Sequence, residues 1–417
     1  RNSDIVWKRY QSGKAMSQTL WCAPVQRSSG RRVLPLVFGV TLTGIMANSL
    51  VSPLLPDILD TFDQSAGSAG PLVAAASMPG IFLAPIIGFA ADRWGRRPVL
   101  TLCLIVFGLA GVLTAVTANF AMLVATRFLL GVGSAGLINL GVVLIGDHFE
   151  GEERTTWIGR NAAILTIGLA IIPLASGVIA EFFSWRIATL GYGFGLLSAA
   201  YAWNVLRDEP VRTSQPLKSQ LAGVGTAMRT PIIATTVTVG TLSFAIIFGV
   251  FLTAMPDHLD TRFAMSSGWR GFMISVPALS SALVGFNLGR IRRVISVRWA
   301  LAISACFWAM GMMFIGWAHV LVVLIIGTLC YGLGEGALIP NLQEVAMSEA
   351  PQEHRGAVVA TWVGFARLGQ TIGPLLAGLL LSASGAPAVF IAGAIASACA
   401  ALIFIVGPIG RSTPTAT

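Results

Sequence analysis

The sequence predicts an all-α membrane protein in which twelve transmembrane helices form two pseudo-symmetric six-helix bundles. Its composition is the first observation, because 55% of the 417 residues are apolar and 11% are charged, whereas soluble domains carry roughly 25% charge. The second is a succession of apolar stretches of about 20 residues, each long enough to cross a bilayer as a helix. The third is an internal repeat that divides the chain into halves. Because lipid offers backbone polar groups no partner, each stretch must be helical.

The predicted elements follow one another with little intervening polar sequence. A polar cytoplasmic tail, 1–30, precedes a first bundle, 31–206, with helices at 33–55, 70–91, 98–118, 121–146, 158–182 and 187–206. The longest polar stretch, 207–231, is expected to be a cytoplasmic linker. A second bundle, 232–410, follows, with helices at 232–255, 270–289, 299–317, 320–346, 358–381 and 387–408, and the tail 411–417 ends the chain.

Basic residues predict the orientation, because cytoplasmic loops carry an excess of arginine and lysine. One side has 18 of them: Arg27, Arg31, Arg32, Arg93, Arg96, Arg97, Arg154, Arg160, Arg207, Arg212, Lys218, Arg229, Arg290, Arg292, Arg293, Arg298, Arg355 and Arg411. The other side has three: Arg186, Arg262 and Arg270. Both termini are therefore expected in the cytoplasm, in a multi-pass protein of the inner cell membrane.

The repeat has a spacing of about 200 residues. "PDILDT" at Pro56–Thr61 recurs as "PDHLDT" at Pro256–Thr261. Six further residues recur 201 positions later, from Gly131, Gly133, Arg154, Gly168, Pro173 and Gly177 to Gly332, Gly334, Arg355, Gly369, Pro374 and Gly378. Parallel half-repeats are typical of membrane transporters whose substrate site lies between the halves near the bilayer midplane.

A loop motif, "GFAADRWGRRP" at Gly88–Pro98, joins the second and third predicted helices. It resembles the cytoplasmic loop motif of the major facilitator superfamily, at Gly88, Asp92, Arg93, Gly95, Arg96 and Arg97. We expect Asp92 and Arg96 to form a charge network with Asp147 that holds the cytoplasmic side closed in the outward-open state. The alternative is a positive-inside anchor. The second-half counterpart has Gly289 in place of the acid, which predicts a weaker contact.

Three helix motifs extend the resemblance. "RFLLGVGSAG" at Arg127–Gly136 resembles the superfamily's intramembrane arginine followed by spaced glycines. Two segments resemble the G-x-x-x-G-P-x-x-G-G motif of proton-coupled drug antiporters, with matching residues Gly168, Pro173 and Gly177 in one and Gly369, Gly373, Pro374 and Gly378 in the other. Ile172 and Ser176 depart from the first, and Ala377 from the second. Close packing of small residues in any helix bundle is the alternative.

Few polar residues lie within the apolar spans. Glu335 is the only acid well inside one, so we expect it to carry the coupling proton, assisted by Arg127 and Arg367. A structural bridge between Glu335 and Arg367 is the alternative. Asn48 is expected either to contact substrate or to form a helix-helix hydrogen bond. Phe248 and Trp362 are candidates for the substrate cavity, whereas Asp57 and Asp257 are expected to be exposed helix-end residues.

The resemblance implies a secondary transporter, most similar to the twelve-helix drug:proton antiporters, that exports small apolar or amphipathic compounds. A dedicated metabolite or siderophore exporter, or a symporter, is the second candidate. An enzyme or ATP-driven pump is not expected, since Gly13-Lys14 lacks the rest of a phosphate-binding loop. The expected partners are substrate, protons and the lipid bilayer, with a monomeric chain, no cofactor, no metal site and no nucleic acid.

Overall fold

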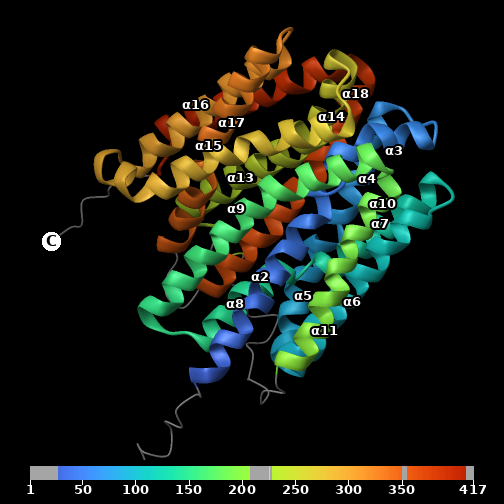
Figure 1. Ribbon diagram of the computed structural model, residues 1–417. Coiled ribbons are helices and arrows are strands. Elements are labelled where there is room, and N and C mark those ends of the chain that lie inside the picture. The colour runs from blue at the N-terminus through green and yellow to red at the C-terminus, as the bar shows by residue number, and fades with distance from the viewer. Residues whose placement is uncertain (1–26, 207–224, 226–227, 350–354, 410–417) are drawn as a thin grey trace, which may run out of the picture.

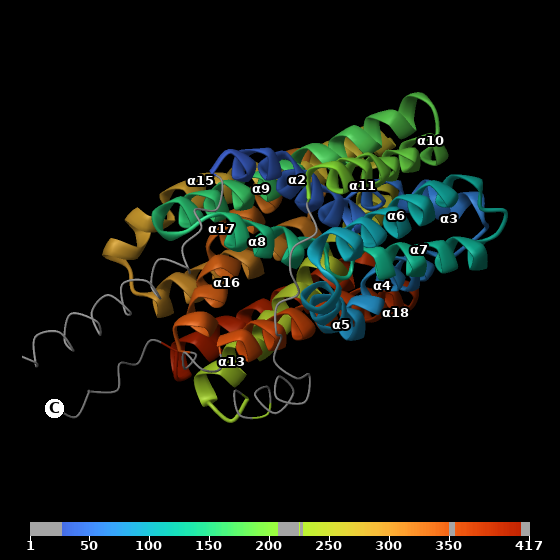
Figure 2. The same cartoon turned by 90° about the horizontal axis from the view of Figure 1, so that it is seen from below.

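The computed structural model describes residues 27–206, 225, 228–349 and 355–409, and within these ranges every regular element is a helix (Figure 1). The predicted all-α class is therefore confirmed. Most helices run along one long axis of the molecule (Figures 1 and 2). This arrangement satisfies the backbone polar groups of each apolar stretch within its own helix.

The first half begins with a long helix and is divided by short 3-10 turns. Its elements are α2 (Arg27–Ser49), η1 (Ser52–Leu54), α3 (Leu55–Thr61), η2 (Ala66–Ser68), α4 (Ala69–Ser77), α5 (Pro79–Trp94), α6 (Arg96–Leu113), η3 (Thr114–Val116), α7 (Phe120–Ser134), α8 (Leu137–His148), α9 (Gly151–Phe182), α10 (Trp185–Thr189), η4 (Leu190–Gly193) and α11 (Phe194–Val205). Between α5 and α6, Gly95 has a φ of 93°, a conformation that glycine adopts without strain.

The second half contains longer uninterrupted helices. Its elements are α13 (Pro231–Ala245), the π-helical η5 (Ile246–Ala254), α14 (Met255–Phe263), α15 (Ser267–Val294), α16 (Val297–Gly316), α17 (Leu321–Ser348) and α18 (Arg355–Val406). Each half has its own buried apolar cluster, one formed by residues 33–206 and the other by residues 233–409.

Ten stretches of the described chain are long and apolar enough to cross a membrane. They are Arg31–Thr61, Ala66–Trp94, Arg96–Val116, Phe120–His148, Gly151–Phe182, Pro231–Phe263, Ser267–Val294, Val297–Gly316, Leu321–Ser348 and Thr361–Val406. Each of the twelve ranges expected from the sequence lies largely within helical elements, but the boundaries differ. For example, α9 begins at Gly151 rather than near residue 158. Polar residues at the helix start extend it beyond the apolar core.

The molecule has two opposite ends, called the linker end and the paired end. The linker end carries Arg96, Asp147 and Arg292, and α11 ends and α13 begins there. The paired end carries Asp57 and Arg270.

The longest helix, α18, changes direction. Gly385 interrupts it with φ 75° and ψ 175°. Before this residue, Gly378 packs against Gly67 near the paired end. After it, the backbone oxygen of Phe404 accepts a hydrogen bond of 3.2 Å from Nε of Arg298, near the linker end. The chain therefore returns along the molecule after Gly385.

Two helix pairs make the most extensive contacts between the halves, α9 with α15 and α4 with α18 (Figure 2). Glycines allow their backbones to approach closely. A Cβ added at Gly177 would lie 2.3 Å from the backbone oxygen of Ser267, and one added at Gly70 would lie 2.4 Å from that of Pro374. Without side chains at these glycines, the seam between the halves closes tightly toward the paired end.

Candidate functional site

Part of each antiporter-like motif lies along the seam. On α9, the backbone oxygen of Pro173 would lie 2.4 Å from a Cβ added at Gly271 of α15. On α18, a Cβ at Gly378 would lie 2.5 Å from the backbone oxygen of Gly67, and one at Gly369 would lie 2.2 Å from that of Thr241. Their role in function stays a prediction. Pro173 and Gly378 lie at the contact between the halves, whereas Gly369 packs against α13 within the second half.

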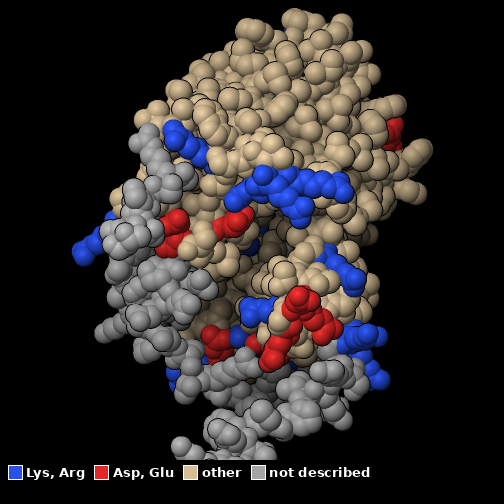
Figure 3. Space-filling view, turned by 90° about the vertical axis from the view of Figure 1, so that its left-hand side faces the viewer, with Lys and Arg blue, Asp and Glu red and all other residues tan. Residues whose placement is uncertain are grey.

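The same seam is open toward the linker end. Glycines there that have no atom within 4 Å of an added Cβ include Gly88, Gly159, Gly285, Gly289 and Gly364. They belong to α5, α9, α15 and α18, which form the tight seam or directly extend it. Figure 3 shows the molecule from this side, where a hollow separates two lobes and lysine or arginine side chains lie on its rim. The described halves are thus closed at the paired end and separated at the linker end.

The loop motif forms the contacts expected from its residues. Arg96 lies 2.5 Å from Asp92 and 3.2 Å from Asp147. The carboxylates neutralise an arginine side chain that is 14% exposed. All three residues lie in the first half, and the contact is present although the linker end is open. In this conformation it fixes α5, α6 and α8 to one another, and its role in holding that end closed in the outward-open state stays a prediction.

The second-half counterpart is a more solvated contact. Arg292 lies 3.2 Å from Glu344, and the two side chains are 27% and 59% exposed. Arg292 also donates to Asn341. Solvent screens such a pair, and exposed ion pairs contribute about 0 to 1 kcal/mol. This agrees with the weaker contact predicted from Gly289.

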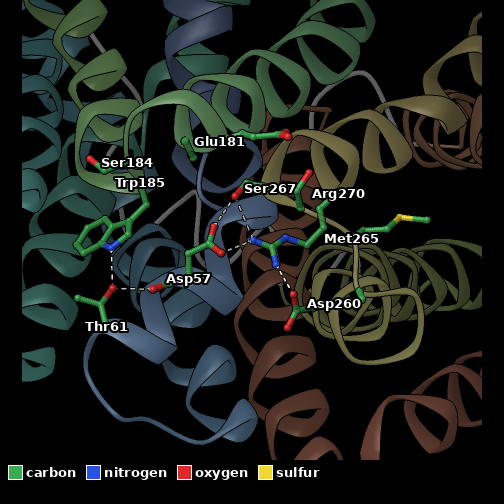
Figure 4. Close-up of a pocket in the computed structure, with 12 residues that line it drawn as sticks. Asp57, Thr61, Glu181, Ser184, Trp185, Asp260, Met265, Ser267 and Arg270 are labelled. Atoms are coloured by element: carbon green, nitrogen blue, oxygen red, sulfur yellow. Dashed lines mark hydrogen bonds and ion pairs between the residues drawn. The ribbon is translucent and has the colours of Figure 1, made fainter.

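Sequence reasoning missed a charge cluster at the paired end (Figure 4). Arg270 is 2% exposed and lies 2.5 Å from Asp57 and 2.6 Å from Asp260. Its Nε donates to the backbone oxygen of Pro53 at 3.0 Å, while Ser267 donates to Asp57 at 2.7 Å. Asp57 belongs to the first half and Arg270 to the second, so the cluster links the halves.

A pocket of about 520 Å³ surrounds this cluster. Glu181 lies on its wall and accepts a hydrogen bond of 3.0 Å from the backbone nitrogen of Gly268 across the seam. Asp57 was expected to be an exposed helix-end residue. It does lie in the first turn of α3, but its side chain is only 34% exposed and pairs with Arg270. The signal was the repeat itself, since "PDILDT" and "PDHLDT" place acids at corresponding positions of the two halves.

Arg127 lies inside the first half and has no exposed surface. It donates to Asn48 and to the hydroxyl of Tyr192, both at 2.8 Å. Asn48 in turn donates to Ser77 at 3.0 Å. Of the two roles expected for Asn48, the structure shows the helix-helix hydrogen bond, and its side chain is 4% exposed. No described acid pairs with Arg127, so a direct influence of Arg127 on a coupling carboxylate is not supported.

Glu335 is half-buried on α17, one turn after Tyr331. Tyr331 is the middle ring of a stack, with its centroid 4.4 Å from that of Phe251 and 5.4 Å from that of Trp308. The Tyr331 hydroxyl and the Trp308 indole nitrogen are enclosed without a hydrogen-bond partner in the described chain. Phe251 lies in η5, and π-helical segments occur frequently at functional sites. An acid thus stands beside an apolar, rigid wall.

Arg367 does not pair with Glu335, so the expected structural bridge between them is absent from the described structure. Its guanidinium donates to the backbone oxygen of Ser134 at 3.3 Å and to the side-chain oxygen of Gln370 at 3.2 Å. Ser134 belongs to the opposite half. Arg367 therefore lies at the seam.

The two aromatic cavity candidates differ. Trp362 is 6% exposed and packs on Gly240 and Phe244 within the second half, and its assignment to the cavity stays a prediction. Phe248 is half-buried on η5, so it remains a candidate.

Comparison with known proteins identifies the fold. The family model described as the Major Facilitator Superfamily matches residues 36–260 and 236–416. The bacillibactin exporter of Bacillus subtilis (strain 168) is 22% identical over 363 residues, covering 82% of this chain and 88% of that protein. The class B tetracycline resistance protein of Escherichia coli is 25% identical over 356 residues, covering 81% and 85%. The crystal structure of the human organic anion transporter MFSD10 has a TM-score of 0.68 at 21% identity, covering 90% and 99%.

Proposed function

Because the chain belongs to the Major Facilitator Superfamily, we propose that it is a secondary active transporter that exports small apolar or amphipathic compounds in exchange for protons. The relatives include proteins named for tetracycline resistance and multidrug resistance. One observation carries the proposal: the seam is packed at one end and open at the other. If the two ends open alternately, a bound compound moves across the membrane without the formation of a continuous channel.

The proposed cycle uses the paired-end cluster as its outer gate. Arg270 joins Asp57 and Asp260 while that end is closed. Opening must separate Arg270 from Asp57, because they lie on different halves. The cost is limited, since the side chain of Asp57 is 34% exposed and can be solvated when released, while Arg270 keeps Asp260.

The proposed proton carrier is Glu335, the half-buried acid within α17. One proton that moves through ~100 mV releases about 2.3 kcal/mol, which sustains a substrate gradient of roughly 50-fold. A single carboxylate is therefore sufficient for useful export. The ring stack of Tyr331 and Phe251 supplies the apolar wall beside it.

The proposed topology has twelve crossings in two six-helix bundles. Ten stretches of the described chain are long and apolar enough to cross a membrane, and the last one extends over both sides of Gly385. Residues 185–205 form α10, η4 and α11, which connect the paired end to the linker end. We place the protein in the inner cell membrane as a monomer, with both termini and the linker end in the cytoplasm, because the sequence predicts 18 basic residues on that side and three on the other. The conformation described is then inward-open.

A dedicated metabolite or siderophore exporter, or a symporter, is the second candidate. The similarity to a protein named as a bacillibactin exporter supports the dedicated exporter among these alternatives. Both candidates are transporters rather than enzymes. The candidates differ in how many kinds of substrate they carry and in the direction in which the proton gradient drives those substrates.

The test is a panel of labelled compounds in cells that lack their own exporters. Cells that express the chain should accumulate several apolar or amphipathic compounds less than control cells, and an uncoupler should remove the difference. A reduction limited to one chemical family would favour the dedicated exporter. Equal accumulation with and without the chain, when its presence in the membrane is verified, would contradict export.

A further inference from the structure

Arg127 and Arg367 lie in the apolar parts of membrane-spanning helices, and their surroundings differ. Arg127 is fully enclosed in the first half, where Asn48 and Tyr192 hold it. Its Nε is enclosed and has no partner in the described chain. Arg367 is half-buried at the seam, where its side chain lies against Gly80 of the first half. Of these two, Arg367 is the one that a compound between the halves could reach.

The guanidinium of Arg367 has neutral partners only among the described residues. Ser134 contributes a backbone oxygen at 3.3 Å and Gln370 an amide oxygen at 3.2 Å. No described carboxylate forms an ion pair with it. A guanidinium has five N–H donors, so these two acceptors leave most of its donors and its whole formal charge uncompensated. A charge at membrane depth costs about 3 kcal/mol or more unless it has a partner or water.

The space beside Arg367 leads toward the open linker end. Gly364, three residues earlier on the same helix, has nothing within 4 Å of an added Cβ, and neither does Gly88 of α5. The Nε of Arg367 donates to no described acceptor, and it is not among the enclosed unpaired atoms of the described structure. A ligand that enters from the linker end therefore meets an accessible donor with a positive charge.

We propose that the transported compounds include amphipathic organic anions, and that Arg367 binds their acidic group. This inference rests on the proposed function and specifies the charge of its substrate. A carboxylate, sulfonate or phenolate would accept hydrogen bonds from the donors that Ser134 and Gln370 do not use. Arginine is suited to this because its planar fork of donors matches the oxygens of such groups. The apolar body of the compound would remain in the apolar surroundings of the seam.

The inference has an energetic consequence for export. When a monovalent anion leaves and one proton enters, two positive charges move inward in each cycle. A neutral compound exchanged for one proton moves one. Each charge through ~100 mV contributes a factor of roughly 50 to the sustained gradient. Export of an anion should therefore respond more steeply to membrane potential than export of a neutral analogue.

Two fluorescent probes with the same skeleton test the inference: 8-anilinonaphthalene-1-sulfonate, an anion, and N-phenyl-1-naphthylamine, which is neutral. The purified full chain in nanodiscs should bind the anion more tightly. Arg367→Gln should weaken binding of the anion by about tenfold to a hundredfold, as expected for hydrogen bonds to a charged group, and change binding of the neutral probe less than about threefold. Arg367→Lys should retain part of the preference, because it keeps the charge without the fork.

The control is Arg262→Gln, which removes a positive charge from an exposed position at the paired end. It should leave both affinities unchanged. Equal loss of anion affinity in this control, or an unchanged anion affinity in Arg367→Gln, would overturn the inference. If Arg367→Gln does not yield folded protein, equal affinities of the unmodified chain for the two probes would overturn it by themselves. Export of the neutral probe driven by a pH gradient tests the proposed function separately.

Discussion

The paired-end cluster predicts that Asp57→Asn opens that end of the molecule. The substitution keeps the size of the side chain and removes the charge that lies 2.5 Å from Arg270. Asp260 remains at 2.6 Å, so Arg270 keeps one carboxylate, but that carboxylate belongs to its own half. What is lost is the ion pair that joins the halves. The closed paired end should become less favourable relative to the open one.

The magnitude follows from the burial of the partners. Arg270 is 2% exposed and Asp57 is 34% exposed, so solvent screens the pair only in part. A hydrogen bond to a charged group contributes about 1.5 to 3 kcal/mol, and a middle value of about 2 kcal/mol corresponds to roughly a 30-fold change in a two-state equilibrium. An open state populated at about 1% would rise to about one quarter of the molecules.

Spin labels across the paired end measure this change. Ser65→Cys and Thr261→Cys place labels at exposed positions of the two halves, after the native cysteines are replaced. Double electron-electron resonance should show a second, longer distance in Asp57→Asn. Asp60→Asn is the matched control, because it removes the same charge from an exposed residue of the same helix. Distance distributions that are identical in Asp57→Asn, Asp60→Asn and the parent protein would refute the gate.

Three further outcomes follow from the contacts at other sites. Asp92→Asn, which removes one of the two carboxylates on Arg96, should abolish transport with normal membrane insertion, and normal transport would contradict this. In Arg127→Lys, the lysine cannot bridge both partners of Arg127, so the melting temperature of the protein should fall, and pH-driven transport and downhill exchange should decrease equally. A loss limited to pH-driven transport would restore a coupling role for Arg127. Gly378→Leu should block transport and lengthen the paired-end distance, because backbone atoms lie 2.5 to 3.2 Å from the added Cβ. Gly364→Ala, whose added Cβ meets open space, should do neither. An active Gly378→Leu would remove the argument for a tight seam.

The fold could be predicted from the sequence because the bilayer imposes one solution on apolar stretches of sufficient length. The loop motif was also predictable in part, since an acid and an arginine one turn apart on neighbouring helix ends had few other partners. The distance of 3.2 Å between Arg96 and Asp147 agrees with that expectation. Which conformation this contact accompanies could not be predicted, because all its residues belong to one half and do not report on the other.

The site was less predictable because its residues are brought together from distant parts of the chain. Asp57 and Arg270 are separated by 213 positions, and hydropathy alone places both at exposed helix ends. A bridge between Glu335 and Arg367 requires similar depth along the membrane normal, but similar depth alone does not bring two residues together. Whether two such residues meet depends on how the helices are rotated about their axes, and rotation is set by the packing of small residues such as Gly332 and Gly336 against α15.

The central claim is that a proton gradient drives export through Glu335, and proteoliposomes test it most directly. A pH step should make the parent protein concentrate a transported compound, and an uncoupler should abolish the accumulation. Glu335→Gln should lose pH-driven accumulation while it still binds the compound and exchanges it between internal and external pools. If Glu335→Gln still concentrates the compound in response to the pH step, Glu335 is not the proton carrier. If the parent protein in the membrane does not respond to the step at all, proton-driven export itself is contradicted.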